Sequence, residues 1–247
     1  MPTILPLEPA AGCRVLVTGG ARGIGRAIAE AFSARDGRIC VLDREPVPDA
    51  PAGWITRRGS TAVAAEVEAA FAAMDAAWGG VDAAYANAGI ARRKPTLEVS
   101  EAEWRDVLDV NLTGVFLTAQ AAGRRMVAAG SGVIVALASI YGLAGGPRIA
   151  AYCATKAGVA NLVRSLAAEW GPHGVRVNAL APGYIETEMT AASEREPIHR
   201  RTPLGRIGQP EEIAGLACFL ASPAAAYING AVLPVDGGWT GHGAQTL

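Results

Sequence analysis

The chain has 247 residues, of which 51% are hydrophobic, and its formal net charge is −1. This length and composition predict a globular protein with a sizeable core. The near-neutral charge and the absence of a block of like charges argue against nucleic acid or a membrane surface as a partner. Cys13, Cys40, Cys153 and Cys218 are scattered without CxxC spacing, so the sequence predicts neither a disulfide framework nor a metal site.

No segment has the composition of a targeting or membrane-spanning sequence. The first residues contain no basic side chain before Arg14, so we expect no signal peptide. The uncharged runs 126–147 and 213–235 are interrupted by glycine, or by proline and asparagine, which suits buried strands and turns better than a spanning helix. We therefore expect a cytoplasmic protein.

Short aliphatic runs alternate with longer alanine-rich segments of helical period along the chain. The expected strands are 14–18, 38–43, 81–87, 132–139, 175–182 and 231–238. The expected helices are roughly 23–35, 62–78, 100–129, 152–170 and 209–221. This alternation predicts an α/β fold, a doubly wound parallel sheet with helices on both faces. Continuous apolar strands such as GVIVALA agree with burial on both sides.

One connection departs from this pattern. The segment 45–53 contains three prolines, so we expect a short loop there instead of a helix. No linker, charge run or internal repeat divides the chain. The sequence therefore predicts one dinucleotide-binding catalytic domain over 1–247, with 1–12 as an N-terminal extension and 184–206 as a substrate loop region.

A glycine-rich loop follows the first expected strand. In TGGARGIG, Gly19, Gly23 and Gly25 lie where the strand turns into a helix. Glycines at such a turn let the backbone N–H groups of a helix N-terminus approach a pyrophosphate closely. The next strand ends in Asp43, eighteen residues after Gly25. This context indicates a dinucleotide site of the Rossmann type.

The acid at the end of that strand favours NAD over NADP. The Asp43 carboxylate can accept hydrogen bonds from both ribose hydroxyls, and its charge would repel a 2′-phosphate. Arg22, inside the loop, and Arg44, directly after the acid, could instead reach a 2′-phosphate. NADP therefore stays open as the alternative cofactor.

Tyr152 and Lys156 lie one helical turn apart and share a face. The chain contains only two lysines among its 22 basic residues, so a lysine here indicates chemistry that arginine cannot do. A tyrosine has an ordinary pKa of about 10, and a neighbouring ammonium lowers that pKa by favouring the phenolate. The pair is thus a candidate proton donor and acceptor.

Two further polar residues are candidates for the same site. Ser139 lies at the end of an expected strand, where open α/β sheets bind ligands, and its hydroxyl could contact a substrate oxygen. Asn111 lies within the long expected helix 100–129, although asparagine is a mediocre helix former. Its amide could point inward to hold water or a backbone group.

Taken together, these motifs resemble the short-chain dehydrogenase/reductase family. TGGARGIG, ANAG (86–89), Asn111, Ser139, YCATK (152–156) and APGYIET (181–187) occur in the order and approximate spacing of that family, from about Cys13 to Gly238. The resemblance implies that Tyr152 is the catalytic acid/base, that Lys156 holds the nicotinamide ribose, that Ser139 orients the substrate oxygen, and that Asn111 supports a proton-relaying water. It implies that the cofactor is bound by Gly19, Arg22, Gly23, Ile24, Gly25, Asp43, Arg44, Asn87, Ala88, Gly89, Tyr152, Lys156, Pro182, Gly183, Ile185 and Thr187.

The sequence departs from the family pattern at two places. Ala86 stands where many members have a first asparagine, and Gly59 and Ser60 stand where many have an aspartate that contacts adenine. Blocks such as VDGGWT resemble the corresponding blocks of sugar and polyol dehydrogenases within the family. The family also commonly pairs the helices corresponding to 100–129 and 152–170, which implies a homotetramer.

Substrate specificity is expected from loops 91–96, 140–149 and 184–206. Arg92, Arg93, Lys94 and Arg148 could favour an acidic or hydroxyl-rich substrate, or could simply be solvated charges. The leading hypothesis is an NAD-dependent dehydrogenase that interconverts a secondary alcohol and a ketone. One alternative is an NADP-dependent ketone reductase of the 3-oxoacyl type. The other is a cofactor-sensing protein without turnover, but such a protein would be expected to lack Ser139, Tyr152 or Lys156, and this chain has all three.

Overall fold

The computed structural model describes residues 5–191 and 193–241. Its core is a seven-stranded sheet in the order β3-β2-β1-β4-β5-β6-β7, in which every pairing is parallel. The strands are β1 (Arg14–Thr18), β2 (Arg38–Asp43), β3 (Ile55–Arg58), β4 (Ala83–Ala86), β5 (Gly132–Leu137), β6 (Val175–Pro182) and β7 (Val232–Val235).

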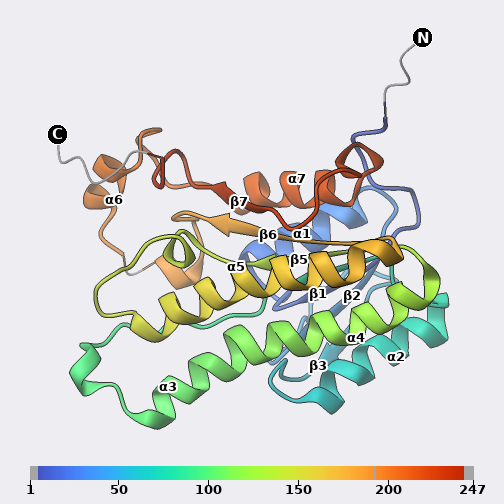
Figure 1. Cartoon of the computed structure of the whole chain (residues 1–247), viewed down its shortest axis with the longest axis horizontal. Coiled ribbons are helices and arrows are strands. Elements are labelled where there is room, and N and C mark those ends of the chain that lie inside the picture. The colour runs from blue at the N-terminus through green and yellow to red at the C-terminus, as the bar shows by residue number, and fades with distance from the viewer. Residues whose placement is uncertain (1–4, 192, 242–247) are drawn as a thin grey trace.

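Helices cover both faces of this sheet (Figure 1). The α-helices are α1 (Gly23–Ser33), α2 (Ala64–Trp78), α3 (Glu101–Leu108), α4 (Gly114–Ala129), α5 (Ala150–Trp170), α6 (Arg195–Arg201) and α7 (Pro210–Ala221). Helices α1 and α7 lie on one face, whereas α2, α4 and α5 lie on the other. The predicted doubly wound α/β fold is confirmed.

The two faces of the sheet bury two separate sets of apolar side chains. Along β1, Leu16 faces the helices α2, α4 and α5, whereas Val15 and Val17 face α1 and α7. This alternation follows from the two-residue period of a strand. Because both faces are covered, nearly every position of the central strands is apolar.

The strand β3 was not expected from the sequence. Its ITRR segment is short and mostly exposed, so it lacks the apolar run by which the other strands were recognised. It lies at the edge of the sheet, where polar side chains are tolerated. The expected loop is confirmed, since no helix lies between Asp43 and Ile55 in this described stretch.

The expected helix 100–129 is divided by a single π-helical turn. Helix α3 begins at a capping box formed by Ser100 and Glu103, and α4 ends before Gly130 in a left-handed conformation. Between them, Asp109–Thr113 forms the π turn, which contains Asn111. Such turns are frequent at functional sites. The helix therefore changes its winding at one of the predicted site residues.

Helix α6 lies inside the segment expected to be a substrate loop. Glu196 in its first turn and basic residues in its last turn complement the helix dipole, and Glu196 pairs with Arg200 one turn later. The helix is only seven residues long and strongly charged, so it has no apolar period by which the sequence could reveal it.

Part of the expected N-terminal extension packs against the main fold. The carbonyl oxygen of Pro6 accepts a hydrogen bond from the Ala224 N–H at 3.1 Å, and Glu8 forms an ion pair with Arg35. Residues 1–4 of that extension lie outside the described residues. The domain boundaries remain a prediction.

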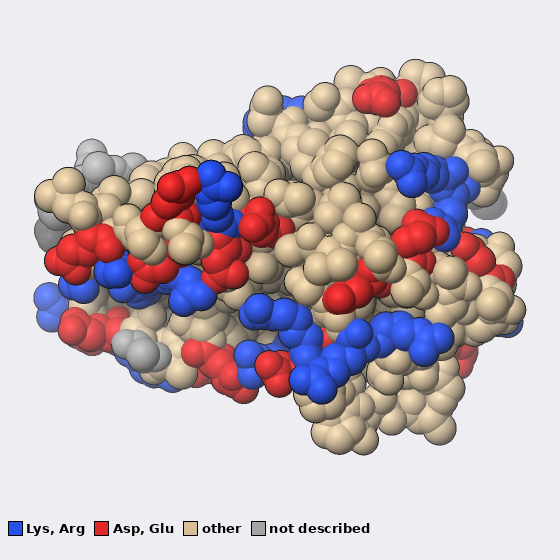
Figure 2. Space-filling model, turned by 90° about the horizontal axis from the view of Figure 1, so that it is seen from below, with Lys and Arg blue, Asp and Glu red and all other residues tan. Residues whose placement is uncertain are grey.

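The surface carries both signs of charge. Figure 2 shows basic and acidic side chains interspersed on the face seen from below. Among the ion pairs, Arg125 on α4 contacts Glu68 and Asp75 on α2. Within the described residues, no helix combines the length and apolar character needed to cross a bilayer.

Tyr85 offers a test of the packing that supports the centre of the sheet. Its side chain is fully buried, its hydroxyl donates to the carbonyl oxygen of Ala217 at 2.8 Å, and its ring packs against Phe32. We expect Tyr85→Phe to lower the free energy of unfolding by about 1 kcal/mol, because the Ala217 oxygen loses a partner. Denaturant melts would measure this, with Tyr227→Phe at a fully exposed position as the control. Equal stability of Tyr85→Phe and the wild type would contradict the account.

Candidate functional site

A cavity of about 480 Å³ opens at the carboxyl ends of the central strands. A second cavity of about 110 Å³ adjoins it and shares Gly19, Arg22 and Ala88 as lining residues. The strand order reverses between β1 and β4, and ligands of open α/β sheets bind at such a reversal. The fold thus places both cavities where a ligand is expected.

The glycine loop leaves no room for side chains at two of its positions. A Cβ atom on Gly19 would lie 2.8 Å from the Ala88 Cα, and Gly19 has a φ of +66°. A Cβ atom on Gly25 would lie only 2.1 Å from the carbonyl oxygen of Gly19. Gly19 lines both cavities. Gly25 lines neither, and its missing side chain lets helix α1 pack closely against the loop from behind.

The N-terminus of α1 is open towards the main cavity. Among the described residues, no side chain caps this helix, and Gly23 and Ile24 of its first turn line the cavity. Uncapped N–H groups at a helix N-terminus attract anions. The tight backbone and the free N–H groups fit a dinucleotide pyrophosphate. Arg22, at the N-cap position, reaches across to Glu188, with 2.9 Å between Nη1 and Oε2.

Asp43 organises the glycine loop and also lines the smaller cavity. Its Oδ2 accepts a hydrogen bond from the Ala21 N–H at 2.9 Å, and its Oδ1 accepts one from the Glu45 N–H at 2.9 Å. Arg44, Gly59 and Ser60 line the same cavity. The carboxylate therefore has a structural function, which leaves its remaining lone pairs available to a ligand.

A hydrogen-bonded clamp joins β1 to the loop after β4. The Thr18 hydroxyl oxygen accepts from the Asn87 N–H at 3.0 Å and from the Ala88 N–H at 3.2 Å. The Asn87 amide donates back to the carbonyl oxygens of Thr18 and Gly19, at 3.0 and 2.9 Å. Sequence analysis missed Thr18, although a polar residue at the end of an apolar strand, just before the glycines, was a usable signal.

Asn111 holds Ile90, two residues further along the same loop. Its Oδ1 accepts from the Ile90 N–H, and its Nδ2 donates to the Ile90 carbonyl oxygen, each at 2.8 Å. Nδ2 also lies 3.4 Å from the Thr155 hydroxyl on α5. Asn111 is fully buried and lines neither cavity. The π turn thus directs this amide onto a backbone segment that lines the main cavity.

Ser139, Tyr152 and Lys156 meet in the main cavity. Ser139 follows β5 and begins a short 3-10 turn, where its hydroxyl accepts from the Tyr141 N–H at 3.1 Å. Tyr152 and Lys156 lie on α5, and the Lys156 Nζ lies 5.6 Å from the centroid of the Tyr152 ring. Lys156 is only 3% exposed, and its Nζ donates to the Leu137 carbonyl oxygen at 2.6 Å.

Burial governs the pKa values of this pair. It raises the pKa of Tyr152 above its ordinary value, while the Ser139 hydroxyl acts in the opposite direction. It lowers the pKa of Lys156 to about 8. The sequence-based expectation of a lowered tyrosine pKa is therefore not met in the protein alone, because loss of solvation outweighs the two groups that act to lower the pKa, the Ser139 hydroxyl and the charge of Arg93.

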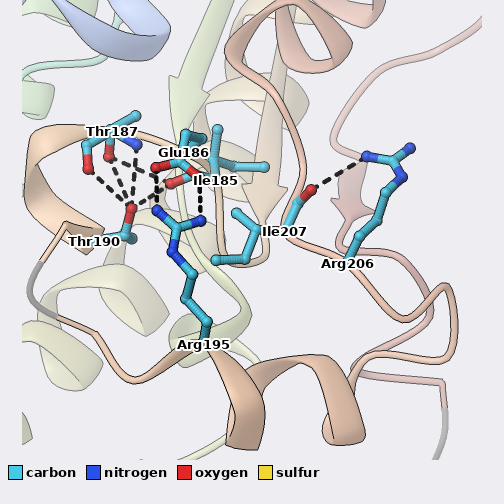
Figure 3. Close-up of polar contacts among 7 residues, drawn as sticks. All are labelled: Ile185, Glu186, Thr187, Thr190, Arg195, Arg206 and Ile207. Atoms are coloured by element: carbon cyan, nitrogen blue, oxygen red, sulfur yellow. Dashed lines mark hydrogen bonds and ion pairs between the residues drawn. The ribbon is translucent and has the colours of Figure 1, made fainter.

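The segment after β6 forms the opposite wall of the main cavity. Gly183 must be a glycine, since a Cβ atom there would lie 2.8 Å from the Asp236 Cα. Figure 3 shows how the following turn is fastened. The Thr190 hydroxyl lies 2.5 Å from the Ile185 carbonyl oxygen and accepts from the Thr187 N–H. Arg195 donates to the Glu186 carboxylate through both of its terminal nitrogens. Helix α6 is thereby tied to the cavity wall.

Two tyrosines that sequence analysis did not single out complete this wall. The hydroxyls of Tyr141 and Tyr184 are 2.6 Å apart, and both residues line the cavity. The Tyr141 ring packs edge-on against Trp239, over which the Arg201 guanidinium lies at 5.1 Å. The two tyrosines came from the loops 140–149 and 184–206, but nothing in their spacing predicted that they would meet.

The structure brings most of the predicted site residues together. Those lining the main cavity are Gly19, Arg22, Gly23, Ile24, Asn87, Ala88, Gly89, Ser139, Tyr152, Lys156, Pro182, Gly183, Ile185 and Thr187. Asp43 and Arg44 line the smaller cavity, whereas Gly25 and Asn111 support the site from behind. The catalytic and cofactor-binding roles of these residues remain predictions.

Comparisons with known proteins identify the family. A family model described as "Enoyl-(Acyl carrier protein) reductase" matches residues 19–240. A galactitol 2-dehydrogenase (L-tagatose-forming) of Cereibacter sphaeroides is 44% identical in an alignment of 242 positions that covers 93% of this chain and 95% of that one.

Solved structures agree with that match. A short-chain type dehydrogenase/reductase from Mycobacterium marinum superposes with a TM-score of 0.89 and 35% identity, over 95% of this chain and 97% of the other. A gluconate 5-dehydrogenase from Burkholderia cenocepacia, in complex with NADP and tartrate, superposes with a TM-score of 0.88 and 37% identity, over 95% of this chain and 98% of the other. Sequence, fold and site therefore agree that this chain belongs to the short-chain dehydrogenase/reductase family of nicotinamide-dependent oxidoreductases.

Proposed function

We propose that the protein oxidises a secondary alcohol of a polyhydroxylated substrate to the ketone, and catalyses the reverse reduction. The observation that carries this proposal is that Ser139, Tyr152 and Lys156 line one cavity together with the glycine loop. A bound nicotinamide ring would supply the acceptor or donor of the hydride. The relatives named for galactitol and gluconate support the substrate class.

Tyr152 is the proposed carrier of the hydroxyl proton. During oxidation the substrate carbon gives up a hydride and the substrate O–H proton passes to the Tyr152 oxygen, and the reverse holds during reduction. With its pKa raised by burial, Tyr152 is a proton donor at neutral pH in the protein alone. To accept that proton Tyr152 must be in its phenolate form, which nearby positive charge favours, and the ammonium of Lys156 is the cation that contacts its ring.

Lys156 is placed at a cost to stability, which argues for a functional reason. Burial of its ammonium disfavours the charged form, as its lowered pKa of about 8 indicates. The Leu137 carbonyl oxygen satisfies one of its three N–H groups, so two remain for ribose hydroxyls or for water. We propose that these groups hold the nicotinamide ribose beside Tyr152.

We propose NAD as the preferred cofactor. The supporting observation is the Asp43 carboxylate, which lines the smaller cavity where the adenosine ribose would lie. Arg44 lines the same cavity and is the residue that would favour NADP. Arg22 is engaged by Glu188, which makes it less available to a 2′-phosphate.

The expected homotetramer and cytoplasmic location also remain proposals. Trp104 on α3 and Phe116 on α4 are 38% and 39% exposed. Partly exposed aromatic side chains of this kind are common where subunits meet. They support pairing through the face formed by these two helices.

Tyr152→Phe tests the chemical step. We expect kcat to fall by at least about 100-fold, because the proton carrier is lost. Affinity for the cofactor, measured by fluorescence titration, should change little. Tyr227→Phe, at a fully exposed position, should retain full activity. Undiminished turnover by Tyr152→Phe would remove the proposed mechanism.

Lys156→Met tests the cost of the buried ammonium. Because the pKa of Lys156 is lowered to about 8 in the folded protein, the cost is fully present below pH 8 and disappears as pH rises towards about 10.5, where the unfolded chain also loses the proton. The variant's stability relative to the wild type should therefore decline by about 1–3 kcal/mol between pH 7.5 and 10.5. Denaturant melts at several pH values measure this difference.

The chain's other lysine supplies the matched control. Lys94 is partly exposed and paired with Glu103, so Lys94→Met should show no comparable change with pH. A pH-independent difference between Lys156→Met and the wild type would show that Lys156 is not charged at a cost.

The cofactor proposal is tested by thermal protection. NAD should raise the melting temperature more than NADP at equal concentration, because the tighter ligand stabilises the folded state more. Asp43→Asn removes the charge at similar size and should narrow or reverse this preference. Asp36→Asn is the control, since Asp36 is exposed and has a φ of +59°, which asparagine tolerates. Greater protection of the wild type by NADP would refute the preference.

A further inference from the structure

Three successive cations follow β4, and only one of them lines the main cavity. Arg92 is bonded to Asp106 on α3, with 3.1 Å between its Nε and Oδ2. The Lys94 Nζ contacts both carboxylate oxygens of Glu103, also on α3, at 3.1 and 3.0 Å. Arg93 lies between these two residues and lines the cavity.

The loop carrying Arg93 is anchored on both sides. In addition to the two contacts with α3, the Lys94 N–H donates to the carbonyl oxygen of Arg148 at 2.8 Å, which joins this loop to the segment before α5. The Arg93 side chain itself makes no hydrogen bond, ion pair or aromatic contact with any residue in 5–191 or 193–241. The backbone at Arg93 is therefore held in place, while the N–H donors of its guanidinium have no partner among the described residues.

The other charges that line the main cavity are already engaged. Arg22 and Glu188 pair with each other, and the Lys156 ammonium donates to the Leu137 carbonyl oxygen. Arg93 is left as the cation of the lining whose side chain has no hydrogen-bond or ion-pair partner among the described residues. A guanidinium offers five donors in a planar arrangement that matches a carboxylate in a bidentate pair.

Arg93 is close enough to influence the reacting end of the cavity. Its charge acts to lower the pKa of both Tyr152 and Tyr141, although burial keeps both values raised. Tyr141 and Tyr184 present hydroxyls on the same wall, where a hydroxylated chain could bind. Because Arg93 and Tyr152 line the same cavity, a ligand of several carbons with its anionic group at Arg93 can extend towards Tyr152.

We propose that Arg93 binds the carboxylate of the substrate, so that the cavity takes polyhydroxy acids in preference to neutral polyols. This assignment rests on the proposed function, and it narrows the substrate class of the same site. Arg93 is a specificity-determining residue here and takes no part in the transfer of hydride or proton.

Matched pairs of an acid and its neutral polyol test the assignment. The pairs are D-gluconate with D-glucitol, D-galactonate with galactitol, and L-threonate with L-threitol, each assayed with saturating cofactor. The acid of at least one pair should be preferred by about 10-fold or more in kcat/KM. For that acid, Arg93→Gln should raise KM by about 10- to 100-fold and leave kcat within a few-fold, since the lost contact is made equally in the ground and transition states.

Two further variants separate the local contact from a general loss of charge. Arg93→Lys retains the charge without the fork and should give an intermediate KM. Arg38→Gln removes one charge at the amino end of β2, away from the cavity at the carboxyl ends of the strands, and should leave both members of each pair unaffected. Better use of the neutral polyol in every pair, or an equal effect of Arg93→Gln on acid and polyol, would overturn the assignment.

A binding measurement keeps this test independent of turnover. Calorimetric titration of the three acids into the cofactor complex of Tyr152→Phe, with and without Arg93→Gln, should show about 10-fold or greater weakening in the double variant. Turnover that survives Tyr152→Phe would refute the proposed mechanism while this binding difference still decides the role of Arg93. Failure of all three acids to bind would overturn the assignment.

Discussion

The close approach of β1 and β4 at their carboxyl ends is the constraint on which the rest of the site depends. Across this junction the Thr18 hydroxyl accepts from the Asn87 backbone N–H, and the Asn87 side-chain amide donates to the Thr18 carbonyl oxygen. Gly25 lets helix α1 approach the carbonyl oxygen of Gly19. Here the strand order reverses, so the two halves of the sheet direct their loops apart and leave the cavity between them. A methyl group at Gly25 would push helix α1 away from the glycine loop. The N–H groups at the N-terminus of α1 would then no longer lie as they do beside the cavity. The tight packing of α1 behind the glycine loop thus positions the loop and the helix N-terminus that line the cavity in front of it.

The same layered arrangement holds the reacting groups. Asn111 does not reach the cavity, yet it fixes both backbone groups of Ile90 and contacts Thr155 on α5. Helix α5 carries Tyr152 and Lys156, so this amide connects the loop after β4 with the helix of the proposed acid/base. The π turn is the local adjustment that brings the amide inward. A regular helix would continue the three- to four-residue spacing of its side chains and direct this position elsewhere.

Sequence alone predicted the layers of the fold and most of the residues that line the cavities, because each depends on local pattern. Apolar runs identified the central strands, and the spacing of Tyr152 and Lys156 identified a shared helix face. It missed β3 and α6, whose charged residues carry no apolar period. It could not pair the hydroxyls of Tyr141 and Tyr184, which are 43 residues apart in the chain. Nor could it separate Arg93 from its neighbours, since Arg92, Arg93 and Lys94 look alike until α3 is placed beside them.

This division between supporting and facing residues bears on how the site can vary. The groups that fix the glycine loop and the loop after β4 bond to backbone atoms, and of these Thr18 and Asn111 are buried and Asn87 is partly buried. Substitution of these groups would therefore disturb the backbone of the site. Some residues of loops 91–96, 140–149 and 184–206 line the cavity. Two of these loops are anchored by residues outside the lining: Lys94 is held by Glu103, and Glu186 by Arg195. Each segment can exchange its cavity-facing side chain while its anchors hold the backbone in place. Substitution of Arg93 or Tyr184 would therefore change the lining of the cavity without removing an anchor of its backbone, because the anchors and these cavity-facing side chains are different residues.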